Sequence, residues 1–274
     1  MIKHFTIALG LTLTTGISHA QNSLSRLWVS DTSLQTPESV LFDPVDKCLW
    51  VSCINGQPLE KDGNGSIWQL RPDGRIIDKA WVTGLHAPKG MARFGKTLYV
   101  SDISELIVID IYNRKITKRI PIEGATFLND VTATEDGTVY VSDMNTGKIH
   151  RLKDDKTDVY LSDLRSPNGV LAVGDALFFL AAGNLYKHQA GITTKLAEGM
   201  DASTDGIEMI KPGEFVVSCW TGVVYHVTET GKVTQMLDTR KKNINSADIG
   251  FDRSTKTVFV PTFFKNNITA YQLK

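Results

Sequence analysis

Four oxygen-bearing side chains stand at the same position of a repeated sequence pattern. Glu38, Asn129, Asn168 and Asp205 each stand at the start of a short apolar segment. Two carboxylates and two amide oxygens that converge suit a hard cation, with waters completing roughly six to eight ligands. Calcium fits this donor set best, with zinc, magnesium and manganese as alternatives, although zinc usually prefers His or Cys. The pattern therefore predicts a divalent metal site.

Each of these residues also has a simpler explanation. Asn168-Gly169 and Asp205-Gly206 are sequences common at turns and strand entries, where the side chain bonds nearby backbone. Glu38 after Pro37 would ordinarily be a surface carboxylate. Recurrence of the donors in register is what favours a shared ligand site over four separate turns.

A repeat of blade size must position these side chains. A β-rich tetrapeptide recurs six times at intervals of 38 to 49 residues: LWVS (49–52), LYVS (98–101), VYVS (139–142), LFFL (177–180), FVVS (215–218) and VFVP (258–261). Shorter apolar segments precede them at 38–43, 89–94, 129–134, 168–173, 205–210 and 247–252. This spacing is typical of one four-stranded propeller blade. We therefore predict an all-β fold, a six-bladed β-propeller with Glu38, Lys89, Asn129, Asn168, Asp205 and Ala247 around its axis.

The last unit lacks a fourth strand. The chain ends at Lys274 directly after the third strand of that unit, whereas LSRLWVSD (24–31) precedes the first unit. We expect the N-terminal strand to complete the last blade, which closes the ring and removes an exposed edge. A sandwich or open β array explains neither the period nor the displaced strand.

Residues 1–20 have the features of a secretory signal peptide. A short start with Lys3 precedes an apolar run, and Ser18-His19-Ala20 provides small residues before Gln21. A membrane anchor is the alternative, but the run is interrupted by Thr and Gly and is shorter than the roughly 20 residues of a span. We expect residues 21–274 to form one exported domain, periplasmic or secreted, with no membrane span.

Composition limits the partners. Lys and Arg balance Asp and Glu at 30 each, so net charge gives no reason to expect nucleic-acid binding. Cys48 and Cys53 flank a predicted strand and would lie roughly 16 Å apart, too far for a disulfide. With Cys219 they are expected to be free, mostly buried thiols, and a small molecule is the expected partner.

The donor segments resemble those of the regucalcin–gluconolactonase–luciferin-regenerating enzyme family, six-bladed propellers of which many are metal-dependent lactonases. The similarity extends over essentially the whole mature chain through short motifs. The matching segments are Pro37-Glu38-Ser39, Phe127-Leu128-Asn129-Asp130-Val131, Ser166-Pro167-Asn168-Gly169-Val170 and Thr204-Asp205-Gly206-Ile207. The resemblance implies metal ligation by Glu38, Asn168 and Asp205, with Asn129 as a further ligand or a water-positioning group. It also implies Asp205 as the catalytic base.

Other residues are expected to contact substrate. Sugar-lactone hydrolases of this family often carry an Arg where this chain has Phe127, so the pocket would take a more apolar lactone or ester, or be non-catalytic. Lys89 could form an ion pair with an anionic substrate, or its positive charge could only compensate the negative charge of the axial carboxylates. Asp130 is a second candidate base or substrate contact. Alternatively, it has only a structural role and holds Asn129 in place. Trp220 and residues 262–264 could shape the pocket mouth, although such aromatics more often pack between blades.

Two functions follow from these expectations. The first is metal-dependent hydrolysis of a lactone or related ester, in which the cation polarises the carbonyl and a carboxylate takes a proton from water. The alternative is a non-catalytic propeller that binds a ligand or protein, with a metal that only ties the blades together.

Overall fold

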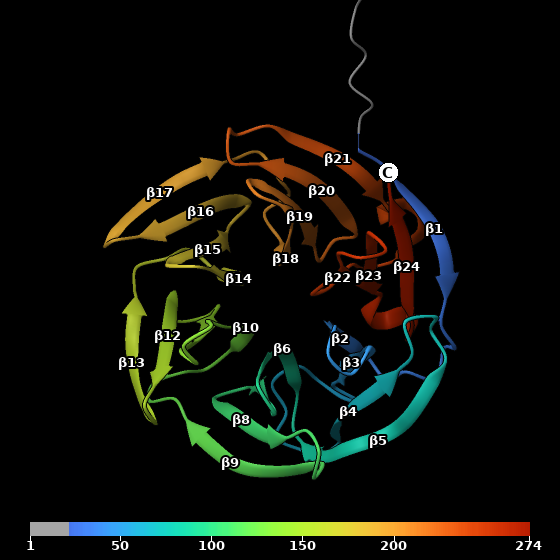
Figure 1. The fold of residues 1–274 in the computed structure, drawn as a ribbon, viewed down its shortest axis with the longest axis vertical. Helices are drawn as coiled ribbons and strands as arrows, with labels where there is room; N and C mark the ends of the chain where they lie inside the picture. The colour runs from blue at the N-terminus through green and yellow to red at the C-terminus, as the bar shows by residue number, and fades with distance from the viewer. Residues whose placement is uncertain (1–21) are drawn as a thin grey trace, which may run out of the picture.

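The computed structural model describes residues 22–274, so the predicted signal peptide and its cleavage site lie outside the described residues. Within this range the chain forms 24 strands in six four-stranded antiparallel sheets. The sheets are arranged as blades around a common axis (Figure 1). Helical structure in this range is limited to two 3-10 turns, η1 (Arg240–Lys242) and η2 (Phe263–Lys265). The predicted six-bladed β-propeller is therefore confirmed.

Each of the first five blades is a four-stranded meander that runs from the axis outward. Blade 1 contains β2 (Pro37–Asp43), β3 (Cys48–Cys53), β4 (Gly65–Leu70) and β5 (Ile76–Leu85). Blade 2 contains β6 (Pro88–Phe94), β7 (Thr97–Asp102), β8 (Glu105–Asp110) and β9 (Lys115–Pro121). Blade 3 contains β10 (Leu128–Ala133), β11 (Val139–Asp143), β12 (Lys148–Lys153) and β13 (Lys156–Leu161). Blade 4 contains β14 (Pro167–Val173), β15 (Ala176–Ala181), β16 (Asn184–Gln189) and β17 (Ile192–Ala197). Blade 5 contains β18 (Thr204–Lys211), β19 (Glu214–Cys219), β20 (Val223–Thr228) and β21 (Val233–Asp238).

Blade 6 combines both ends of the described chain. It contains β22 (Gly250–Asp252), β23 (Thr257–Pro261), β24 (Ile268–Leu273) and, as its outer strand, β1 (Leu24–Val29). β1 pairs antiparallel with β24, from Leu24 opposite Leu273 to Val29 opposite Thr269, and the two lie side by side in Figure 1. The predicted closing strand is confirmed, and it covers an edge that would otherwise be open for pairing.

The innermost strand of blade 6 is shorter than predicted. The sequence indicated a strand over 247–252, whereas β22 begins at Gly250. The backbone of Asp248 bonds across to blade 1 instead, donating from its amide to Glu38 O at 3.0 Å and accepting from the amide of Val40 at 3.2 Å. The ring is therefore joined at the axis as well as at its rim.

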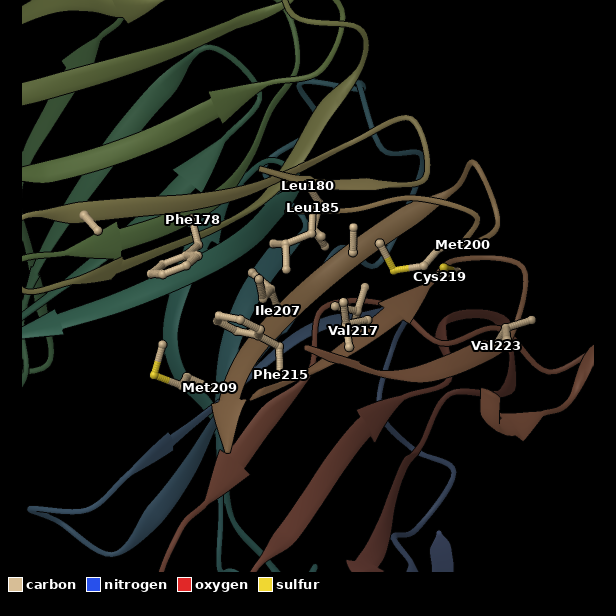
Figure 2. Packing of buried hydrophobic residues seen from close by; sticks show 13 residues of the cluster. Phe178, Leu180, Leu185, Met200, Ile207, Met209, Phe215, Val217, Cys219 and Val223 are labelled. Atoms are coloured by element: carbon tan, nitrogen blue, oxygen red, sulfur yellow. The ribbon is translucent and has the colours of Figure 1, made fainter. Parts of the chain in front are cut away.

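Apolar side chains fill the spaces between neighbouring blades. Figure 2 shows one such cluster, in which Phe178 and Leu180 of blade 4 face Ile207, Phe215 and Val217 of blade 5. Strands such as β3 and β15 are buried along their whole length because a blade inside a ring is covered on both faces. This explains why the second strand of each unit is mostly apolar on both faces instead of alternating apolar and polar residues.

The remaining whole-chain predictions concern thiols and membrane spans. Cys48, Cys53 and Cys219 are free and buried, as predicted. Burial raises the pKa of Cys53 to about 12, which makes its thiol a poor nucleophile. No helix within residues 22–274 has the length and apolarity needed to span a membrane.

Candidate functional site

Five inner strands direct their second residue into one cavity at the axis. These residues are Glu38 of β2, Lys89 of β6, Asn129 of β10, Asn168 of β14 and Asp205 of β18. Each is between 1% and 6% exposed, and all line a cavity of about 420 Å³. The sixth predicted position, Ala247, is buried and supplies no polar side chain. The structure thus brings together the four predicted oxygen donors and Lys89.

A β-bulge aims each of these side chains. In blade 3, Leu128 pairs with Asp143 and Val131 with Val141, so Asn129 and Asp130 together face the single residue Ser142. The same two-against-one register shift occurs between β6 and β7, β14 and β15, and β18 and β19, and a related shift isolates Glu38 between Pro37 and Ser39. A bulge releases residues from the ladder and redirects them, which is why bulges are frequent at functional sites.

The serine that ends most of the repeated tetrapeptides supports these bulges. Ser142 Oγ accepts from the amide of Asp130 at 3.0 Å, and Ser218 Oγ accepts from the amide of Gly206 at 2.9 Å. Ser218 Oγ also donates to Ala247 O of the next blade at 2.8 Å, and Ser101 Oγ donates to Asn129 O in the same way. The repeated serine therefore satisfies buried backbone groups that the bulge leaves without ladder partners.

The glycines that follow the axial residues allow the inner strands to approach each other. A Cβ on Gly169 would lie 2.3 Å from Asp205 O, and one on Gly206 would lie 2.5 Å from the amide nitrogen of Ile249. Neither glycine has the positive φ that turn chemistry would require. Close backbone packing around the axis, rather than a turn, thus explains Asn168-Gly169 and Asp205-Gly206.

Three donor oxygens at the cavity have no hydrogen-bond partner among the described residues. They are Glu38 Oε2, Asn129 Oδ1 and Asn168 Oδ1, all fully buried. Asn168 directs its amide nitrogen to Asp205 Oδ1 at 3.1 Å, which orients its own oxygen away from Asp205. Buried acceptors without partners are rare and costly in proteins, so this arrangement fits a cation that would accept their lone pairs.

The electrostatics of the donors lead to the same interpretation. Burial, opposed by Lys89 and reinforced by Asp248, raises the pKa of Glu38 to about 8. Burial, followed by the charges of Glu38 and Asp248, raises the pKa of Asp205 well above its usual range. Two buried carboxylates are expensive to ionise unless a positive charge joins them. A divalent cation at this position would supply that charge.

The donor set is half amide. Residues 22–274 contain no group of three or more His, Cys, Asp or Glu side chains that could hold a metal ion. The candidate site instead combines two carboxylates with two amide side chains, so its possible donors are oxygens rather than thiolates or imidazoles.

Lys89 contributes a buried positive charge beside the donors. Its ammonium donates to Pro58 O at 2.9 Å and Ala87 O at 2.8 Å and lies 5.0 Å from the centroid of the Phe127 ring. Burial, opposed by Glu38 and Asp102, lowers the pKa of Lys89 to about 8. An ammonium has three hydrogens, so one remains for a ligand.

The other two predicted substrate contacts fall in different places. Phe127 lines the cavity, and its amide donates to Asp143 Oδ1 at 3.1 Å, which fixes the backbone before β10. Asp130 does not line this cavity. It faces a second axial cavity of about 210 Å³, which Glu208 and Asp248 also line, and its Oδ1 has no hydrogen-bond partner among the described residues.

Ile54 and Met144 of the cavity wall carried no sequence signal of a site, whereas Trp220 and residues 262–264 were expected near the pocket mouth. Ile54 and Met144 follow the second strands of blades 1 and 3, and Ser166 precedes β14. Trp220, Phe263 and Phe264 complete the wall, with Trp220 and Phe264 partly exposed at its rim. All lie in loops at the end of the propeller where the inner strands begin. These loops are neighbours only because of the way the blades are aligned around the axis. The spacing of the sequence repeat gives that alignment only approximately.

Comparisons with solved structures confirm the fold. A gluconolactonase of Xanthomonas campestris is similar over 94% of this chain and 96% of its own, with a TM-score of 0.65 and 15% identity. A putative gluconolactonase is similar over 93% of both chains, with a TM-score of 0.64 and 15% identity. A catalytically inactive histidine-to-alanine variant of virginiamycin B lyase from Staphylococcus aureus, solved with quinupristin, is similar over 93% of this chain and 100% of its own, with a TM-score of 0.65 and 14% identity. No protein-family model and no curated protein matches the sequence.

Proposed function

We propose that this protein is a divalent-cation-dependent hydrolase of a lactone or related carboxylic ester. Glu38, Asn129, Asn168 and Asp205 would hold the cation, with calcium favoured by the oxygen-only donors. The observation that carries the proposal is the set of three buried, unpartnered oxygens at one cavity, next to Asp205. The gluconolactonases among the similar structures support the choice of reaction.

The residues of this chain divide the chemistry between them. When bound, the cation would polarise the substrate carbonyl and stabilise its developing negative charge. Asp205 accepts the Asn168 amide at Oδ1, which leaves Oδ2 to take a proton from attacking water. The water oxygen bonds to the carbonyl carbon, the carbon–oxygen ester bond breaks, and the proton passes to the departing alkoxide. The product is a hydroxy acid, or an acid and an alcohol.

Lys89 and Phe127 shape the substrate side of the cavity. The unused hydrogen of the Lys89 ammonium can donate to a substrate oxygen or to the carboxylate that hydrolysis creates. The Phe127 ring supplies apolar contact instead of hydrogen bonds, which favours a substrate with fewer hydroxyls than a sugar lactone. The cavity lining contains no histidine, so its acid–base groups are the carboxylates Glu38 and Asp205 and the ammonium of Lys89.

The test combines metal analysis with a panel of lactones and esters. We expect calcium to raise the melting temperature of metal-free protein and to restore hydrolysis, with magnesium, manganese and zinc assayed alongside. Asp205→Asn should lower kcat by roughly 10²–10⁴-fold, the contribution of a general base. Glu208→Gln is the matched control, because Glu208 lies on the same strand but lines the second axial cavity. Equal activity of Asp205→Asn and wild type would rule out the base, and no calcium-dependent shift in melting temperature would rule out the metal site.

A further inference from the structure

Three aromatic rings form a continuous wall at the mouth of the axial cavity. Trp220 follows β19, and Phe263 and Phe264 begin η2 after β23. The Trp220 ring lies 5.9 Å from Phe263 and 6.0 Å from Phe264, and the two phenylalanine rings are 4.7 Å apart. The interplanar angles of 75° to 85° are those of edge-to-face packing, a favourable geometry for aromatic pairs.

The backbone holds this wall in a fixed position. Phe263 has φ 49°, a left-handed conformation that is unfavourable for a bulky residue. Its carbonyl accepts from the amide of Asn266 at 3.0 Å, and its side chain is buried. Trp220 donates from its amide to Ser203 O and accepts at its carbonyl from Asn245 Nδ2, both at 2.8 Å. Strained residues of this kind persist where surrounding structure over-determines them, often at ligand sites.

The wall exposes apolar surface toward the cavity mouth. Trp220 is 40% exposed and Phe264 is 65% exposed, whereas the axial residues at the base of the same cavity, such as Asn129, are buried. Exposed aromatic surface beside a concave site gains free energy when a ligand covers it. Because the rings are already ordered, the ligand would not have to immobilise them on binding.

We propose that the substrate carries an aryl or similarly flat apolar substituent, which packs against Trp220 and Phe264. This inference rests on the proposed function, because the ester carbonyl of the same molecule would reach the four oxygen donors. The cavity volume of about 420 Å³ leaves space for a substituent beyond the reacting ring, within the range of roughly 300–1,000 Å³ that holds drug-sized ligands.

A pair of lactones that differ only in the substituent tests the proposal. Wild type should hydrolyse phenyl-substituted δ-valerolactone with a kcat/KM at least about tenfold above that of the unsubstituted ring. Trp220→Ala and Phe264→Ala should each raise KM for the phenyl compound roughly tenfold, the effect of about 1.4 kcal/mol of lost binding, with kcat retained. KM for the unsubstituted ring should not change. Trp220→Phe should restore part of the preference.

A non-hydrolysable ligand separates this proposal from the proposed function. Isothermal titration calorimetry with the phenyl-substituted δ-valerolactam measures binding even if neither lactone is hydrolysed. Tyr112→Ala is the control, since Tyr112 is an exposed aromatic on blade 2 that lies outside the cavity lining. Weaker lactam binding in Trp220→Ala and Phe264→Ala, but not in Tyr112→Ala, supports the aromatic wall whatever the activity. The proposal would be overturned if all variants bound the lactam with equal affinity. It would also be overturned if the ratio of kcat/KM for the two lactones were the same in wild type and in the wall variants.

Discussion

Several buried polar side chains at the axis have no hydrogen-bond partner among the described residues, and this lowers the stability of the fold. A buried acceptor without a partner costs about 1–3 kcal/mol, and Glu38, Asn129 and Asn168 each contribute one such oxygen. The carboxylates add to this cost because burial raises the pKa of Glu208 to about 8 and of Asp248 to about 7. The free energy of unfolding should therefore depend on both pH and cations.

We expect metal-free protein to lose stability between about pH 5 and pH 8. The raised carboxyl pKa values mean that the folded state binds more protons than the unfolded state in this range, so stability decreases as pH rises. The lowered pKa of Lys89, about 8, acts in the opposite direction, but only above the carboxyl range. The melting temperature in chelator should fall by more than about 4 °C, which corresponds to roughly 1–2 kcal/mol for a chain of this size.

Added calcium should reduce this loss, since a cation at the proposed site would bind the deprotonated carboxylates and favour the folded state. Differential scanning calorimetry from pH 5 to pH 8, in chelator and in calcium, measures both effects. Glu208→Gln should flatten the pH dependence in chelator without removing the calcium effect. A melting temperature in chelator that stays constant over this range would contradict the prediction.

At the scale of elements, the bulge and the repeated serine position the donors. The sequence predicted the inner strands and the residue that each directs to the axis, because both follow from the period of the repeat. It did not predict the bulges, which separate Asn129 from Asp130 and direct them into different cavities. In a regular strand, successive residues point to opposite faces of the sheet. This rule does not predict that two successive residues, Asn129 and Asp130, line two different cavities near the axis.

Ser218→Ala should destabilise the protein by about 1–3 kcal/mol. The substitution removes the acceptor of the Gly206 amide and the donor to Ala247 O, and it leaves both backbone groups buried. Denaturant unfolding, monitored by intrinsic fluorescence, measures the change. Ser162→Ala is the control, because Ser162 is exposed and bonds only the neighbouring Asp163 side chain. Equal stability of the two variants would show that the serine does not support the bulge.

At the scale of the whole molecule, two seams close the ring: an outer one inside blade 6, where the two ends of the described chain pair, and an inner one between blade 6 and blade 1. The outer seam, the pairing of β1 with β24, was predictable because the last unit lacked a strand. The inner seam was not, because it depends on Asp248 leaving its own blade to bond Glu38 and Val40. The sequence suggested Trp220 and residues 262–264 for the pocket mouth, but it did not predict that their rings pack against one another. Trp220 and Phe263 lie 43 positions apart, and only the packing of blades 5 and 6 brings their rings together.

Removal of β1 should cause the protein to form dimers or larger oligomers. A chain that starts at Thr32 leaves the edge of β24 unpaired, and unpaired edges recruit strands from other molecules. Size-exclusion chromatography should show dimers or larger species, and the melting temperature should fall relative to a chain that starts at Gln21. A monomer with an unchanged melting temperature would contradict the closing role of β1.

The inner seam also has a consequence for the order of folding. Glu38 belongs to the first blade, yet its backbone is bonded to Asp248 near the end of the chain, more than two hundred residues later. Contacts of such long sequence separation form late, because loop-closure entropy must be overcome first. We therefore expect Glu38 to reach its final backbone position only after nearly all of the chain has been synthesised. Calcium affinity would thus report the last stage of refolding, whereas β-sheet content would report the earlier, blade-by-blade stages.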